Sequence, residues 1–327
     1  MTAVATDITR RYRFQGAQLA VRSDDPELCA AVDYRLRDCR EDSASPADIV
    51  LEYLTRCADD DLAPGPDEQA RVIYETPAGS VSYVPEGDLI TALFGTVRMW
   101  AAPGAGVVRV SSERYSPGDR YLAAHPLTMV ALCELFKRRG RFSLHAACVG
   151  DERGAALIAG PTGVGKSTLV LALATLGFGV GADDMVFLEG SGSEVVAHGF
   201  SDAVGVMVDT AARFEQLSDL ADRPPPNGFR KHLIRIEDRF SVPRIARCRP
   251  GALIFPERIS GSESRIEPMG ADEAWLRLVP DVLLSHPAAT QAHLAVIAAL
   301  TEQVACYRLS AGTDVLAAAG LIGGLLA

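Results

Sequence analysis

The chain has 327 residues, of which 48% are hydrophobic and 23% charged, and its formal net charge is −10. This composition is typical of a soluble globular protein, and the length fits two domains or one large one. The acidic balance argues against nucleic acid as the main partner, because a phosphate backbone requires a basic surface. Residues 1–20 show no signal peptide, and no apolar run reaches the roughly 20 residues that span a bilayer. We therefore expect no membrane partner and a cytoplasmic location.

The cysteines form no recognisable metal or disulfide pattern. Seven are scattered along the chain without a CxxC pair, and the six histidines show no ligand spacing. This usage predicts reduced, mostly buried thiols and no zinc site. The cysteines are Cys29, Cys39, Cys57, Cys133, Cys148, Cys248 and Cys306.

Residues 1–125 are punctuated by turn signals such as Pro77-Ala78-Gly79 and Pro117-Gly118. One helix is expected near Pro26–Cys39, after Ser23-Asp24-Asp25. The close spacing of the strand-like runs predicts an antiparallel sheet of hairpins. These runs are Arg71–Tyr74, Ser80–Val84, Leu89–Phe94, Val97–Ala101 and Val107–Ser111. No catalytic constellation stands out, so we expect a scaffolding or substrate-docking module.

The pattern changes near Pro126, where we place the start of a second domain, residues 126–327. Apolar residues at helical spacing predict a helix over Leu127–Arg138 that ends in a basic run. Strand-like Ser143–Val149 and Ala155–Ala159 follow. The apolar stretch Val315–Ala327 is too short to span a membrane and is expected to form a packed terminal helix.

A phosphate-binding loop follows the second of these strands. Residues 160–167 read GPTGVGKS and fit GxxxxGK[ST] without a mismatch, and a helix, Ser167–Leu176, is expected to lead out and stop at Gly177. Glycines let successive backbone N–H groups point at one centre, and the helix N-terminus adds a partial positive charge. Lys166 would place a cation on the β and γ phosphates, and the Ser167 hydroxyl would bind Mg²⁺. The predicted nucleotide-binding residues are Gly160, Pro161, Thr162, Gly163, Val164, Gly165, Lys166, Ser167 and Thr168.

Two adjacent carboxylates lie in an apolar segment one helix further on. Phe178–Leu188 is expected to be a strand with Asp183 and Asp184 in its middle. Carboxylates are costly to bury without a counter-charge, and successive side chains of a strand point to opposite faces. One aspartate is therefore expected to face Mg²⁺ and the other to act as a general base on an acceptor.

Three motifs stand in a specific order: SLHAA at 143–147, GPTGVGKST at 160–168 and GADD at 181–184. Together they resemble the catalytic domain of HPr kinase/phosphorylase, and more closely the HPr-kinase-related serine kinases of peptide-modification gene clusters, including those of lasso peptides. The resemblance covers roughly residues 126–260. It implies an α/β fold: a P-loop domain like those of HPr kinase and PEP carboxykinase, with a mixed sheet, preceded by a smaller sheet-rich domain over residues 1–125.

The resemblance also implies a set of roles and ligands. Asp183 would be the general base, with His145 close to it and Lys166 on the phosphates. Ser167 and Asp184 would hold Mg²⁺, with ATP as phosphoryl donor. HPr kinases are hexamers, so a homo-oligomer is compatible with the resemblance, but no surface here identifies one.

The chain departs from the HPr kinase pattern in two places. Residues 201–206 read SDAVGV and lack the family's metal-binding Glu followed by Arg-Gly, for which Asp202 is the available substitute. The family's Pro-Gly-Arg-Asn loop is echoed only by Arg249-Pro250-Gly251. Phosphoryl transfer needs further cations besides Lys166. The candidates are Lys231, which follows the Pro-rich loop Pro224–Gly228, and Arg244, Arg249 and Arg258.

Three functions remain open from the sequence. The first is an ATP-dependent kinase acting on a Ser or Thr hydroxyl of a peptide or small protein, such as a ribosomal precursor peptide. The second is a small-molecule kinase on the same fold, because the acceptor pocket has no readable code. The third is a nucleotide-gated regulatory protein, against which the intact Lys166, Asp183, Asp184 and His145 argue. Which aspartate is the base also stays open.

Overall fold

The computed structural model describes residues 8–326 apart from 42, 44, 56–69, 152–153, 192–193, 201–202 and 226–229. The chain forms two compact units, Met1–Arg141 with Leu283–Gln291, and Phe142–Val282 with Ala292–Ala327. The expected boundary at residues 125 and 126 differs from this division. Helix α3 (Thr128–Lys137) belongs to the first unit, where the ring of Phe136 packs edge-on against Phe14 with centroids 5.1 Å apart.

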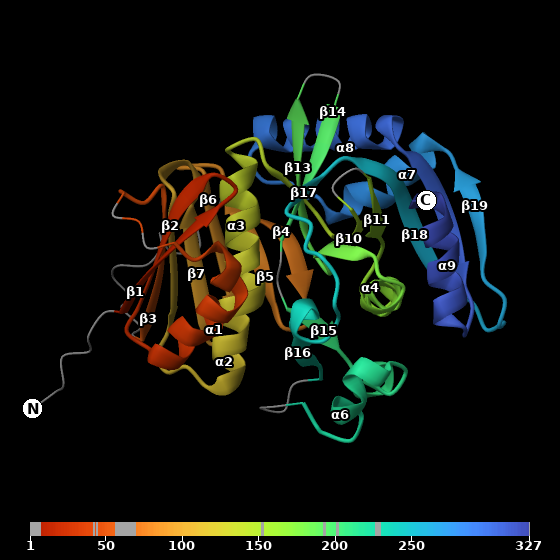
Figure 1. Ribbon diagram of the computed structural model, residues 1–327. Coiled ribbons are helices and arrows are strands. Elements are labelled where there is room, and N and C mark those ends of the chain that lie inside the picture. Colours follow the sequence, from red (N-terminus) through yellow and green to blue (C-terminus); the bar gives the residue numbers. More distant parts are fainter. Residues whose placement is uncertain are drawn as a thin grey trace, which may run out of the picture. The chain divides into compact units, whose positions relative to one another are not determined.

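Within the described residues, the first unit is built on one sheet (Figure 1). The strand order of this sheet is β1-β2-β3-β8-β7-β6-β5-β4. Strands β4 to β8 form an antiparallel meander, which confirms the expected hairpins. Strand β3, however, pairs in parallel with both β2 and β8, so the sheet is mixed. The parallel pair arises because helix α1 (Pro26–Leu36) makes the crossover from β2 to β3. The strands are β1 (Ile8–Phe14), β2 (Ala17–Ser23), β3 (Ile49–Thr55), β4 (Arg71–Thr76), β5 (Gly79–Val84), β6 (Leu89–Phe94), β7 (Val97–Ala102) and β8 (Val107–Ser112).

The helices of this unit begin and end where local chemistry dictates. Asp25 caps α1 by accepting a 2.9 Å hydrogen bond from the backbone N–H of Leu28, and Pro26 occupies the first turn. A 3₁₀ turn, Arg37–Cys39, extends α1 to the expected end. Helix α2 (Pro117–Leu122) continues through a π-helical turn, Ala123–Leu127, into α3. The wider turn contains Pro126, which has no N–H to donate to the helix.

The second unit contains three sheets within the described residues. Six strands form a mixed sheet in the order β12-β10-β11-β18-β20-β19, in which β11–β18 and β18–β20 are parallel. A four-stranded antiparallel sheet has the order β17-β14-β13-β9, and β15 pairs with β16. The strands are β9 (Phe142–Leu144), β10 (Ala146–Gly150), β11 (Ala155–Ala159), β12 (Gly179–Ala182), β13 (Val186–Ser191), β14 (Glu194–Gly199), β15 (Val204–Val206), β16 (His232–Ile234), β17 (Arg247–Cys248), β18 (Pro250–Arg258), β19 (Arg265–Met269) and β20 (Ala305–Ala311).

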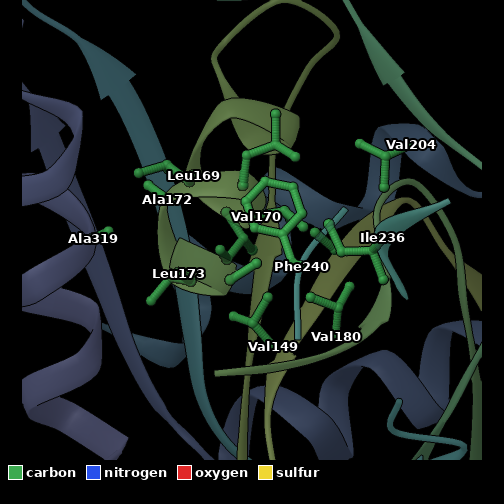
Figure 2. Close-up of a cluster of buried hydrophobic side chains, with 14 of the residues drawn as sticks. Val149, Leu169, Val170, Ala172, Leu173, Val180, Val204, Ile236, Phe240 and Ala319 are labelled. Atoms are coloured by element: carbon green, nitrogen blue, oxygen red, sulfur yellow. The ribbon is translucent and has the colours of Figure 1, made fainter. Parts of the chain in front are cut away.

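Strand β11 is buried on both faces, and its side chains alternate between two cores. Ala156 and Ile158 face a cluster that includes residues of α4 (Lys166–Thr175) and α9 (Val315–Leu326). Figure 2 shows part of this cluster, with Leu169, Leu173 and Ala319 among its labelled members. Leu157 faces a second cluster, to which α7 (Ala271–Leu278) and the later turns of α8 (Pro287–Gln303) contribute. A five-residue apolar strand is therefore enough to fix the position of the loop that follows it.

Helix α9 packs against α4 and buries Ala318, Ala319 and Ile322, as expected of a packed terminal helix. No helix in the described part of the chain is both long and apolar enough to cross a membrane. The six described cysteines are free, and Cys57 lies outside the described residues.

Candidate functional site

His145 and the aspartate pair lie where two antiparallel chain segments pass from one sheet to another. The expected strand Ser143–Val149 is interrupted at His145, between β9 in the four-stranded sheet and β10 in the six-stranded one. The expected strand Phe178–Leu188 is likewise interrupted, so Asp183 and Asp184 lie between β12 and β13 and not in the middle of a strand. The register pairs Cys148 with Ala182 on one side and Leu144 with Val186 on the other. The two interruptions therefore lie next to each other. His145, Asp183 and Asp184 lie in them, outside the paired strands of both sheets.

The glycine loop connects the end of β11 to the start of α4. Gly160, Gly163 and Gly165 have φ values of +145°, +92° and +106°, a region that side chains rarely adopt. A Cβ on Gly163 or Gly165 would meet no neighbour, so backbone conformation alone explains these two glycines. Gly165 also precedes α4 without any side-chain cap, which leaves the first N–H groups of the helix available to a ligand.

Lys166 is the first residue of α4, and its side chain is enclosed. The residue is only 6% exposed, and Nζ donates to the backbone oxygens of Gly160, at 2.6 Å, and Pro161, at 3.3 Å. Burial lowers the pKa of Lys166 below its usual value, whereas Asp184, Asp183 and Asp281 raise it. The ammonium group is therefore held on the inner side of the loop, with carboxylates around it.

His145 connects Lys166 to the aspartate pair. Its Nδ1 lies 3.0 Å from the backbone oxygen of Asp184 and 3.3 Å from that residue's Oδ1, and its Nε2 lies 2.9 Å from Lys166 Nζ. A carbonyl oxygen can only accept and an ammonium can only donate. These contacts therefore assign the proton to Nδ1 and leave Nε2 as an acceptor.

Asp183 is buried beside the hydroxyl that follows Lys166. It is 8% exposed, and its Oδ2 accepts from Ser167 Oγ at 3.0 Å and from the Gly205 N–H at 3.4 Å. Burial, followed by the nearby charge of Asp184, raises the pKa of Asp183 to about 7, although Ser167, Lys231 and Gly205 act to lower it. Its second oxygen, Oδ1, is buried and has no hydrogen-bond partner among the described residues.

The surroundings of Asp183 fit a magnesium ion. A buried carboxylate oxygen without a partner carries a large desolvation penalty unless a ligand satisfies it. Ser167 Oγ and the carboxylate supply the oxygen ligands that Mg²⁺ prefers, and this ion usually keeps several waters and takes few protein ligands. Among the described residues, no group of three or more His, Cys, Asp or Glu side chains could hold a metal ion, so protein ligands other than Ser167 and Asp183 are not in place.

Asp184 and Asp281 are the other two carboxylates whose charges act on Lys166. The side chain of Asp184 is 57% exposed, in contrast to its buried neighbour. Asp281 ends the 3₁₀ turn Val279–Asp281 after α7; desolvation and Asp184 raise its pKa, whereas His145 and Lys166 lower it. Asp281 was not predicted from the sequence, because nothing local marks an aspartate that lies about a hundred residues beyond Asp183 and Asp184.

The four candidate cations have different surroundings, and only one of them is placed to act on the site. Lys231 lies beside Gly205, and its charge acts on both Asp183 and Lys166. Arg244 instead contacts Glu237 at 3.3 Å, and Arg249 contacts Glu194 at 3.2 Å. Arg258 ends β18 as an exposed residue. Asp202 and part of the loop Pro224–Gly228 lie outside the described residues, so their expected roles stay predictions.

Comparison with known proteins adds one distant likeness. The structure of the HPr(Ser) kinase/phosphatase from Coxiella burnetii aligns with 56% of this chain and 93% of its own, at 14% sequence identity and a TM-score of 0.29. No protein-family model matches the chain, and no curated protein sequence matches it.

Proposed function

We propose that this protein is an ATP-dependent kinase that transfers the γ-phosphoryl group to a Ser or Thr hydroxyl of a peptide or small protein. One observation carries the proposal. The glycine loop, the enclosed Lys166, the Ser167–Asp183 contact and the His145–Asp184 contact meet at one place, although they come from segments up to 39 residues apart. Phosphoryl transfer is achieved almost entirely by positioning and by electrostatic stabilisation, and these groups supply both.

The loop and Lys166 would bind the phosphates of ATP. Uncapped N–H groups at the start of α4 and in the glycine turns offer donors to phosphate oxygens. In this structure the Lys166 ammonium donates hydrogen bonds to two loop carbonyls and to His145. When ATP binds, it would instead donate to anionic phosphate oxygens, which are stronger acceptors.

The contacts favour Asp183 and Ser167 as the groups that would hold Mg²⁺. Ser167 Oγ lies 3.0 Å from Asp183 Oδ2, and the free Oδ1 offers a further ligand. When bound, Mg²⁺ would neutralise charge on the phosphates. This allocation reverses the one drawn from the sequence, in which Asp184 was the metal ligand and Asp183 the base.

Asp184 is then the better candidate for the general base. Its carboxylate is more than half exposed and so can be reached by an acceptor, and it lies beside His145, whose position is fixed from its other side by Lys166. In the reaction, the acceptor oxygen forms a bond to the γ-phosphorus, the bond from that phosphorus to the β-γ bridging oxygen breaks, and Asp184 accepts the hydroxyl proton. The raised pKa of Asp183 supports the opposite assignment, so the two roles need a direct test.

The acceptor class rests on the order of the SLHAA, GPTGVGKST and GADD motifs, which resembles that of peptide-modifying serine kinases. A small-molecule acceptor on the same site is the alternative.

The test is transfer of label from [γ-³²P]ATP to a panel of serine-rich peptides with Mg²⁺, followed by mass spectrometry. We expect one phosphate to be added by the wild type. Asp184→Asn should lower kcat by roughly a hundredfold or more while leaving nucleotide affinity intact. Asp183→Asn should instead raise the Mg²⁺ concentration that gives half-maximal rate. Labelling of a small hydroxyl compound but of no peptide would contradict the proposed acceptor, and loss of Mg²⁺ dependence in Asp184→Asn rather than Asp183→Asn would restore the allocation drawn from the sequence.

A further inference from the structure

Gly205 leaves a space that the side chain of Lys231 occupies. Gly205 is the middle residue of β15, and Lys231 directly precedes β16, whose Leu233 pairs with Gly205. A Cβ on Gly205 would lie 2.9 Å from Cδ of Lys231 and 3.5 Å from its Nζ. Any larger residue at this position would push the lysine aside, so the glycine permits the stem to lie against the backbone of β15.

The same glycine contacts the candidate metal ligand. Its N–H donates to Asp183 Oδ2 at 3.4 Å, so Gly205 lies against both the stem of Lys231 and the carboxylate that contacts Ser167. The charge of Lys231 also acts to lower the pKa of Asp183. Lys231 is exposed, and no carboxylate among the described residues forms an ion pair with it. Its charge is therefore available to a ligand that arrives at Asp183.

The site needs such a charge. The γ-phosphoryl group spreads negative charge over three oxygens as it is transferred, and cations that face it in a preorganised position stabilise this state. Lys166 is only 6% exposed and is held on the inner side of the loop by the carbonyls of Gly160 and Pro161. Lys166 would therefore face the phosphates from the loop, whereas Lys231 lies against Gly205, from where its charge acts on Asp183.

We propose that Lys231, seated against Gly205, is a second catalytic cation that contacts the phosphoryl group during transfer. This inference rests on the proposed kinase function. It assigns to Gly205 the role of positioning that lysine, which a substitution at Gly205 can probe without changing any charge.

The experiment compares four variants in Mg·ATP-dependent transfer to the serine peptide that the wild type phosphorylates. Lys231→Met removes the charge and keeps the stem, Lys231→Arg keeps a charge, and Gly205→Ala adds the Cβ that displaces the stem. Arg230→Met is the matched control, because it removes the neighbouring exposed cation. Thermal melting and calorimetric binding of Mg·ADP, measured on every variant, check the fold and the nucleotide site separately.

We expect Lys231→Met to lower kcat by roughly 100-fold, with Mg·ADP affinity changed by less than about threefold. Lys231→Arg should recover part of the rate, Gly205→Ala should lose part of it, and Arg230→Met should match the wild type. If the wild type transfers phosphate and Lys231→Met does so equally fast, this proposal is overturned while the kinase function stands. If Gly205→Ala melts like the wild type and keeps its full rate, the positioning role of Gly205 is overturned. Absence of transfer by the wild type itself overturns the kinase function and this proposal with it.

Discussion

Asp183 and Asp184 are adjacent in sequence but have opposite surroundings. Asp183 is buried against Ser167 and Gly205, whereas the side chain of Asp184 is 57% exposed beside His145. The difference arises because the chain leaves one sheet after Ala182 and joins another at Val186. Two chemically identical groups can therefore serve as metal ligand and as base, since their environments set their reactivity.

The buried state of Asp183 predicts a pH dependence of stability in metal-free protein. Burial raises its pKa to about 7, so the folded chain retains a proton that the unfolded chain releases near pH 4. The contribution of this group to stability is thus complete below its ordinary pKa and declines as pH rises to about 7. Asp183→Asn removes the decline. Relative to wild type, the variant should gain roughly 2 to 3 kcal/mol in unfolding free energy between pH 5 and pH 8.

Urea denaturation in EDTA at several pH values measures this difference. Asp184→Asn is the matched control, because the carboxylate it replaces is largely exposed. A difference between Asp183→Asn and wild type that stays constant from pH 5 to pH 8 would show that Asp183 is ionised throughout.

Among the helices, strands and loops, the glycine loop could be predicted from the sequence. The conformation of the two segments that carry His145 and Asp183 could not. The GxxxxGK[ST] pattern fixes strand, turn and helix within about twenty residues, and β11, the glycine φ values and α4 agree with it. The interruptions at His145 and at Asp183 were missed, because apolar residues continue on both sides of each break. A change of sheet is decided by pairing with distant strands, such as β13 with β9, which local periodicity does not record.

Other site residues escaped prediction for the same reason. Asp281 reaches the site from the end of α7, and Gly205 acts through a contact with Lys231. Only Gly205 carried a signal, since a glycine between two valines in a strand often marks a close approach of another group.

Helix α9 offers a prediction that does not depend on function. Gly320 and Gly324 are exposed, and a Cβ on either would meet no neighbour, whereas a Cβ on Gly323 would lie 2.9 Å from the Phe178 ring. Gly320→Ala or Gly324→Ala should therefore stabilise the protein by about 0.5–1 kcal/mol through helix propensity. Gly323→Ala should destabilise it by about 1–2 kcal/mol through crowding. Thermal melting ranks the three, and equal effects would contradict the packing of α9.

At the scale of the whole chain, the first unit joins segments that lie far apart in sequence. Glu134 on α3 is 1% exposed, and its carboxylate contacts Lys137, Arg138 and Ser285. Lys137 also donates to the backbone oxygen of Leu283. This polar network was not predicted, because the sequence shows Lys137 and Arg138 only as a basic run at a helix end.

This network predicts a large cost for a small change. Glu134→Gln should destabilise the protein by about 3–5 kcal/mol, because it leaves the buried Lys137 without its counter-charge, whereas Arg138 keeps its pair with Asp88. Glu263→Gln, at the exposed pair with Arg265, is the control and should have no measurable effect. Chemical denaturation of both variants tests this, and equal behaviour would mean that the Glu134 network does not stabilise the first unit.

Residues 160–168, together with Asp183, should form a Mg·ATP site, and calorimetric titration of the full chain with Mg·ATP measures this binding. We predict roughly micromolar binding by the wild type, weakened about 100-fold or more in Lys166→Met and little changed in Arg230→Met. Absence of ATP binding, or binding that Lys166→Met leaves intact, would contradict the account.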